Sequence, residues 1–397
     1  MRKILSILVA FALLFSVVPI GYCTDDSDNS QKVMSFNLQQ AVDYALKHNR
    51  NILIQDLNVK KAELFYKKEM KRLDKYEDYK EELKNMTPEE KALLPGETPM
   101  QIMEQKKIDM GVAKRAIELN FQIAKWNKEI KQNEIKYDVE KAYYDLMQAE
   151  KSMEIAKESL ELAKKQYEQS KKMFELGLLS NQELLEMECA VSQAQTAYTS
   201  AQMNYQFQRV NFNNILGLPL NQEVKLDGTV QYEKHDEINL EDSIEEAFKN
   251  NAMLKVAKEK TELTKLVFKA AEAIYPKNTY KYKEYEIELE EAIKNLETVE
   301  KGIEMEVRMA YLKLLTAEKQ IKTCEMTVKK SEEALRLAML SYEAGQKTPN
   351  DVTKARIELM KAKNDLANQI YNYNIALLDF KYSIGLGKRQ LPEIYLK

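Results

Sequence analysis

The sequence predicts an all-α protein made of long antiparallel coiled-coil helices in two tandem repeats. The first observation is the scarcity of turn residues, because 397 residues include only 10 glycines and 8 prolines, against the usual ~7% and ~5%. The second is a composition of 31% charged and 44% hydrophobic residues, which favours helices without the low hydrophobicity of disordered chains. The third is a heptad pattern of apolar residues that occurs twice along the chain.

Charge and rare residues argue against several classes of function. The 60 basic and 63 acidic residues give a net charge of −3 and form no basic cluster, so we expect no nucleic-acid partner. His48 and His235 stand alone, and the three cysteines form no Cys-x-x-Cys pair. We therefore expect no metal site and no cofactor. Without a recognisable nucleophile, metal cluster or phosphate loop, we also expect no enzymatic activity.

The N-terminus has the pattern of an export signal. Two basic residues precede a 15-residue apolar run, which suits a signal peptide and is short for a membrane span of ~20 residues. We predict a signal peptide over residues 1–23, cleaved after Cys23, and an exported linker over residues 24–35. Two alternatives stay open. In the first, Cys23 is kept and lipidated, although Tyr22 before it is bulky for a lipidation motif. In the second, the signal peptide is not cleaved and anchors the protein in the membrane.

The rest of the chain contains one unit twice. We predict a first helical repeat over residues 36–216, a linker over 217–238, a second repeat over 239–384 and a tail over 385–397. The opening motif of the first repeat returns 202 residues later, whereas its long helix returns 168 residues later. The second repeat therefore lacks 34 residues between its first and second helices. We expect it to be shorter at the end where these two helices meet.

Each repeat is predicted to hold three helices. In the first repeat they span residues 37–86, 100–176 and 181–216, so that the second, about 115 Å long, pairs with two shorter helices stacked end to end. Prolines mark the turn between the first two helices. Apolar residues recur at alternating steps of four and three along the second helix, which is the pattern of a left-handed coiled coil. This heptad seam comprises Ala142, Leu146, Ala149, Met153, Ala156, Leu160, Ala163, Tyr167, Ser170 and Phe174, and in the second repeat Ala310, Leu314, Ala317, Ile321, Cys324, Val328, Ser331, Leu335, Ala338 and Tyr342.

The opposite ends of the long helices carry glycine turns. Gly177 is predicted to end the second helix, and Ser180 with Glu183 forms a capping box that starts the third. The second repeat has Gly345 at the equivalent place. Its third helix starts with Thr348 as N-cap, Pro349 in the first turn and Asp351 at the third position. Helix capping alone explains most of these residues.

The order of these motifs resembles that of TolC-type outer-membrane efflux proteins. The segments around the two glycine turns, residues 174–185 and 341–352, carry the likeness, together with the opening residues 36–41 and the Leu-Gly ending at 215–219. The resemblance covers residues 36–387. It implies a homotrimer whose coiled coils form one α-barrel, an outer-membrane location, an adaptor protein bound at the glycine turns, and an inner-membrane pump reached through the adaptor. The implied function is transport of small molecules or proteins across the cell envelope.

The resemblance also implies a gate at the glycine turns. Tyr342, Lys347 and Asp351 match gate positions of the second repeat, and Glu183 matches their acidic partner in the first. In the family such residues hold the entrance closed through hydrogen bonds and salt bridges. Lys354 stands where a further acidic residue is expected. The alternative is that Glu183 only caps its helix and Lys347 is solvated.

One region departs from the family pattern. The family's membrane strands lie between the first and second helices, but residues 71–84 and 101–110 read as charged helices, and the tyrosine-rich residues 279–285 as helix or loop. None supplies the ~9–11 residues with an apolar face that a lipid-facing strand needs. We therefore predict a TolC-like α-barrel protomer without a membrane β-barrel, placed in the outer membrane, on the outer face of the cytoplasmic membrane or in the cell wall. The alternative function is a non-conducting envelope stalk or scaffold.

Overall fold

The computed structural model is predominantly helical. It describes residues 33–92, 94, 96–228, 232, 234–387 and 390–392. The predicted signal peptide and the cleavage site at Cys23 lie outside the described residues. Among the described helices, none combines the length and apolar composition that a membrane crossing requires.

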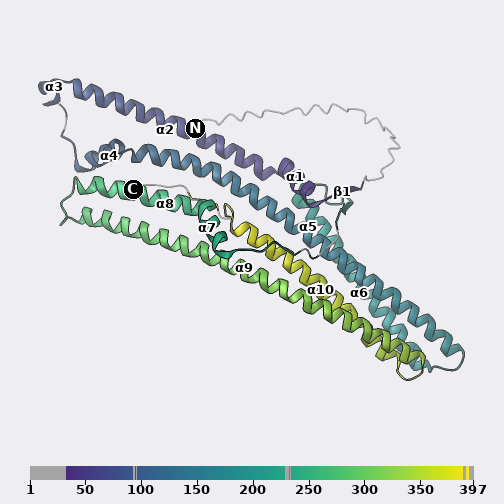
Figure 1. Ribbon diagram of the computed structural model, residues 1–397. Helices are drawn as coiled ribbons and strands as arrows, with labels where there is room; N and C mark the ends of the chain where they lie inside the picture. The colour runs from purple at the N-terminus through teal and green to yellow at the C-terminus, as the bar shows by residue number, and fades with distance from the viewer. Residues whose placement is uncertain are drawn as a thin grey trace, which may run out of the picture. The chain divides into compact units, whose positions relative to one another are not determined.

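Two sets of helices follow each other along the chain (Figure 1). The first set consists of α1 (Leu38–His48), α2 (Arg50–Asn85), α3 (Pro88–Ala92), α4 (Pro99–Asp109), α5 (Val112–Glu175) and α6 (Asn181–Leu216). The second consists of α7 (Leu240–Asn250), α8 (Ala252–Glu272), α9 (Tyr280–Glu343) and α10 (Pro349–Ser383). Two three-residue strands, β1 (Met34–Phe36) and β2 (Val224–Leu226), pair in parallel. The predicted all-α class of long antiparallel helices is therefore confirmed.

Two of the predicted continuous helices are wrong. The helix expected over residues 37–86 breaks at Asn49, whose backbone is extended and whose side chain accepts a hydrogen bond from the Asn51 amide at 2.9 Å. Asn251 breaks the second repeat in the same way, because asparagine caps a new helix well. The helix expected over residues 100–176 breaks at Gly111, which has a left-handed φ of 73°.

The two sets differ in length at the predicted end. Helices α5 and α9 are 64 residues each, but α2 has 36 residues where α8 has 21. The first set also inserts α3 and α4, with Thr98 capping α4. Residues 280–285 form the first turns of α9, as expected for a tyrosine-rich segment that is not a strand.

The long helices pack as hairpins that contact one another. Helix α5 pairs with α6, and α9 pairs with α10. Helix α2 lies along α5 and α8 along α9, while α10 and α8 also contact α5 and so join the two repeats (Figure 1). Helix α10 also contacts α6. Near the glycine turns α9 lies against α10, and α6 lies against α5 and α10, so we call α6 and α9 the outer helices.

The heptad seams form the core of these hairpins. Ala142, Leu146 and Ala149 are at most 2% exposed on α5, and Leu314 and Ile321 are equally buried on α9. Full burial of a leucine side chain contributes about 1.5–3 kcal/mol. The seam weakens toward the first turn, where Phe174 is 38% exposed because its helix ends one residue later.

Candidate functional site at the glycine turns

The two glycine turns have the same backbone geometry. Gly177 and Gly345 each have a φ of 72°, in the left-handed region that glycine adopts without strain. In each turn two amides bond back to the last helical turn, which is the Schellman pattern. These bonds run from Leu178 to Met173 (2.9 Å), Gly177 to Phe174 (2.9 Å), Gln346 to Ser341 (2.8 Å) and Gly345 to Tyr342 (2.9 Å).

Both helices that leave the turns begin with the predicted capping boxes. The Ser180 amide and hydroxyl donate to the Glu183 carboxylate at 2.9 and 2.7 Å, and the Glu183 amide donates to the Ser180 hydroxyl. Thr348 and Asp351 repeat this arrangement at 3.0 and 2.8 Å, with Pro349 in the first turn. The side-chain bond from Ser180 lowers the pKa of Glu183, and the backbone bond from Thr348 lowers that of Asp351. The capping prediction is confirmed.

Tyr342 lies inside the protomer. Its side chain is 9% exposed and packs with Leu335, Ala338 and Val352. Its hydroxyl is 2.9 Å from the hydroxyl of Ser170, which is fully buried on α5. This hydrogen bond joins the α9–α10 hairpin to the α5–α6 hairpin just above the glycine turns.

Lys347 and Glu183, which are the expected salt-bridge partners at the gate, are not brought together within one chain. Among the described residues, Lys347 and Glu183 form no ion pair with each other, and Glu183 is engaged in its cap. Lys347 and Lys354 are exposed, and both contribute to lowering the pKa of Asp351. The gate assignment of Tyr342, Lys347, Asp351 and Glu183 stays a prediction about contacts between chains.

Two buried polar residues near the turns were missed by the heptad reading. Arg356 on α10 is 4% exposed and donates to the carbonyl and hydroxyl oxygens of Ser159 at 3.2 and 2.7 Å. Gln166 on α5 is also 4% exposed, and its Nε2 has no partner among the described residues. A heptad pattern predicts one contact face per helix, but α10 contacts α9, α5 and α6. The sequence did carry a signal for this contact. Arg356 directly follows Ala355, which packs against the α9 cluster, so Arg356 lies on another face of α10, where it contacts α5.

The two outer helices carry a second, exposed heptad series. From Met305 onward, the exposed apolar residues of α9 are separated by three, four, eleven or fourteen positions, which all fit a 3.5-residue repeat. Ile287 and Ile293, nearer the start of α9, are also exposed but lie outside this series. On α6 steps of four and three relate Met203, Phe207 and Val210, whereas Leu185 lies outside this repeat. On α9 they are Met305, Met309, Leu312, Met326, Leu337 and Leu340, which are 49–64% exposed, and on α6 they are Met203, Phe207 and Val210, which are 38–68% exposed. We call these two series the α9 edge and the α6 edge.

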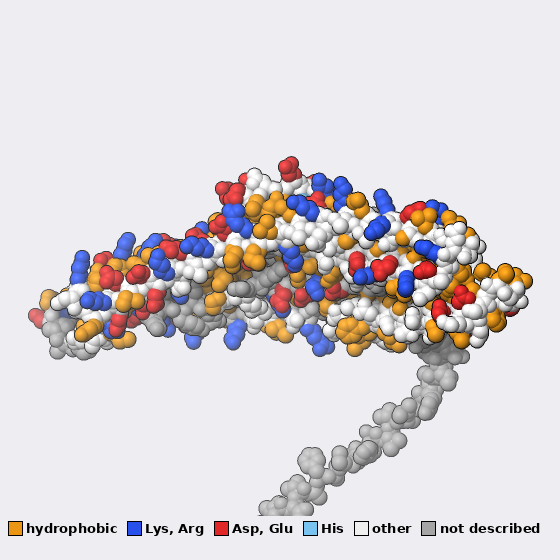
Figure 2. Space-filling view, turned by 90° about the horizontal axis from the view of Figure 1, so that it is seen from below, with side chains coloured by type: hydrophobic (Ala, Val, Ile, Leu, Met, Phe, Trp, Pro, Cys, Tyr) orange, Lys and Arg blue, Asp and Glu red, His pale blue; other side chains and the backbone are white. Residues whose placement is uncertain are grey.

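One face of the molecule mixes charged and apolar groups. On the face shown in Figure 2, hydrophobic side chains lie among acidic and basic side chains along the length of the helices. No large area of a single charge is seen on that face. This agrees with the near balance of 60 basic and 63 acidic residues.

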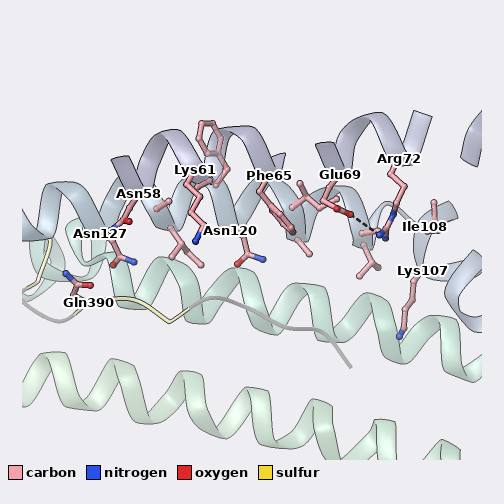
Figure 3. Close-up of a pocket in the computed structure, with 18 of the residues that line it drawn as sticks. Asn58, Lys61, Phe65, Glu69, Arg72, Lys107, Ile108, Asn120, Asn127 and Gln390 are labelled. Carbon is pink, nitrogen blue, oxygen red and sulfur yellow. Dashed lines mark ion pairs between the residues drawn. The ribbon is translucent and has the colours of Figure 1, made fainter. Parts of the chain in front are cut away.

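A cleft lies far from the glycine turns. It has a volume of about 870 Å³ and is bounded by α2, α4 and α5 (Figure 3). Its nearly buried charges are paired locally, Glu69 with Arg72 at 3.1 Å and Lys107 with Glu104 at 2.7 Å. The charges therefore neutralise each other and do not converge on one point, as the groups of a reaction centre do.

One comparison with known protein families concerns part of the second repeat. Residues 275–386 match the family model described as outer membrane efflux protein. The resemblance to outer-membrane efflux proteins is confirmed. No curated protein sequence matches the chain at a significant level.

Solved structures of such channels share the fold. The outer membrane protein VceC from Vibrio cholerae is 13% identical, with a TM-score of 0.65 over 89% of this chain and 97% of its own. The CmeC outer membrane channel from Campylobacter jejuni is 14% identical, with a TM-score of 0.67 over 88% and 86%. The open state of the MtrE outer membrane channel from Neisseria gonorrhoeae is 14% identical, with a TM-score of 0.64 over 89% and 90%. At these identities the likeness concerns the fold.

Proposed function

We propose that this protein is a TolC-like conduit component of an efflux or secretion system. In this role it carries small molecules or proteins across the cell envelope, together with an adaptor and an inner-membrane pump. The family match of residues 275–386 supports this role. The observation that carries it is the presence of two unpartnered heptad edges on the outer helices of one protomer.

The two edges favour a closed ring. Exposed apolar residues at heptad spacing are the usual contact surface of a further helix. The α6 edge and the α9 edge are different surfaces on different helices, so a contact between them is head-to-tail, and such contacts generate rings when the rotation closes. By resemblance to the family we infer three protomers. The α2 residues Leu53, Leu57 and Leu64, 61–69% exposed, extend the free surface away from the turns.

The glycine turns are the proposed contact site for the adaptor. They are the points where both hairpins end, and Leu176 and Leu178 beside the first turn are 74% and 69% exposed. Apolar side chains at such exposed turns suit a protein partner. Between protomers we infer that Lys347 of one chain approaches Glu183 of its neighbour. Each such exposed bridge contributes only about 0.2–1 kcal/mol.

The proposed location is the cell envelope. An efflux conduit of this family acts at the outer membrane, and the N-terminal residues have the pattern of an export signal. Attachment through a lipidated Cys23 or through a retained signal is part of the same proposal. Metabolic labelling with a radioactive fatty acid, compared between the wild-type chain and Cys23→Ser, tests the first of these attachments.

Conduction by the purified protein tests the proposed function. The protein is purified with its proposed N-terminal attachment in place and reconstituted into planar bilayers or liposomes, and ion current or release of a trapped dye is recorded. We expect discrete conductance and a ring-shaped particle in electron micrographs. A well-formed particle without a lumen, and without current at any voltage, would instead favour the non-conducting stalk.

A further inference from the structure

Arg356 is a buried cation without an acidic partner. It lies on α10, eight residues after the Thr348 cap, at the contact with α5. Its Nη1 donates to two neutral oxygens of Ser159, and its Nε has no hydrogen-bond partner. Among the described residues no carboxylate forms an ion pair with it. Glu158, the neighbour of Ser159, is instead paired with Lys363 at 3.0 Å.

Such a group opposes the packing around it. Moving a charge out of water is costly unless a counter-charge and a full set of hydrogen bonds replace the water. Two bonds to neutral oxygens replace only part of it. Burial also lowers the pKa of the Arg356 guanidinium, with no nearby carboxylate to raise it again. The apolar neighbours Val352, Ala355 and Leu359 favour the packed arrangement of the hairpins. Favourable apolar packing and the unfavourable burial of the Arg356 charge therefore act at the same contact.

We propose that Arg356 weakens the contact between the α5–α6 and α9–α10 hairpins and thereby favours their separation near the glycine turns. When α10 moves away from α5, water reaches the guanidinium and the penalty is relieved. The apolar side chains nearby lose contacts in the same movement. The two terms together keep the closed and separated arrangements close in free energy, as a switching element requires. This regulatory role rests on the proposed conduit, whereas the effect on hairpin packing does not.

Hydrogen exchange measured on the whole purified protein tests the effect on packing. In Arg356→Met the charge is removed while a long apolar side chain is kept. We expect peptides covering residues 349–363 to exchange about tenfold more slowly than in the wild-type protein. Arg336→Met is the matched control, because Arg336 on α9 is 58% exposed and pairs with Glu333 of its own helix. In Arg336→Met, hydrogen exchange of the α10 peptides should be the same as in the wild-type protein.

A second variant decides the matter if Arg356→Met folds poorly. Ser159→Asp supplies a carboxylate where the guanidinium now donates, so exchange in α10 should slow when Arg356 is present. Faster exchange in Arg356→Met, or faster exchange in Ser159→Asp with Arg356 intact, would show that Arg356 holds the hairpins together and would overturn the proposal.

The outcome is separable from that of the proposed function. Exchange is recorded without any transport, so a protein that shows the predicted exchange but never conducts contradicts only the conduit. Conversely, a conducting protein whose exchange is the same in Arg356→Met as in the wild type contradicts only the inference about Arg356. In a conducting protein the inference also predicts that Arg356→Met lowers the fraction of time spent open.

Discussion

The hydrogen bond between Tyr342 and Ser170 gives a sharp test of how the two hairpins meet. Both side chains are at most 9% exposed, and their hydroxyl oxygens are 2.9 Å apart. Tyr342→Phe leaves the Ser170 hydroxyl buried without this partner, and Ser170→Ala does the same to Tyr342. An unsatisfied buried hydroxyl costs about 1–3 kcal/mol, so we expect each single variant to lower the free energy of unfolding by about 1–2 kcal/mol.

The double variant separates this bond from general packing effects. Removing both hydroxyls leaves neither unsatisfied, so its loss should not exceed the larger single loss, with a coupling of about 1 kcal/mol. The assay is equilibrium unfolding in urea, followed by helical circular dichroism. Tyr280→Phe is the control, because Tyr280 is 89% exposed and its change should be close to zero. Single effects that simply add, or a neutral Tyr342→Phe, would refute the bond within one chain and return Tyr342 to a contact between chains.

Three further predictions concern the turns. Gly177→Ala and Gly345→Ala should each lower the free energy of unfolding by about 1–2 kcal/mol, measured in thermal or urea unfolding. The reason is the backbone φ of 72°, since the space for a Cβ atom is free at both sites. Gly302→Ala within α9 should instead raise the free energy of unfolding by about 0.5–1 kcal/mol, and equal effects at the three sites would contradict the reasoning. Because the pKa values of Glu183 and Asp351 are lowered, their caps should stabilise the fold fully above the ordinary pKa values of 4.5 and 3.8, and this stabilisation should be lost as pH falls through the folded pKa values. In urea unfolding from pH 7 to 2, Glu183→Gln should lose less stability on acidification than the wild-type protein. Identical pH profiles for the two proteins would contradict the role of the Glu183 cap. If Lys347 meets Glu183 across chains, Lys347→Glu should raise leak through reconstituted protein and Glu183→Lys should restore closure, whereas a double variant as leaky as the single one removes the gate.

The periodicity of apolar residues in the sequence is sufficient to predict which residues form the core of the hairpins. Alternating steps of four and three place Ala142, Leu146 and Ala149 on one face, and all three are buried. The same counting cannot detect a break such as that at Asn49, because apolar spacing continues across a single extended residue. The backbone signal there was local, an asparagine able to cap α2.

The site was predictable in its backbone and less so in its contacts. Glycine and capping residues specify local geometry, so the turns at Gly177 and Gly345 followed from the sequence. The partner of a side chain depends on which helices are neighbours, and one heptad seam per helix does not give this. Tyr342 was therefore placed correctly at the turn, but its bond to Ser170 was not foreseen, and Arg356 was missed because α10 has more than one neighbouring helix.

The central claim is that the free edges of α6 and α9 close a ring of several chains. Multi-angle light scattering of the purified protein gives its molar mass directly, and we expect the mass of three mature chains. Met326 lies on the α9 edge and is 64% exposed, so Met326→Glu should leave the single chain folded but reduce the mass to that of one chain, because it places a charge in the interface. Thr327→Glu, one position away and off the edge, should remain an assembly of three. A wild-type protein with the mass of one chain, or equal masses for both variants and the wild type, would contradict the account.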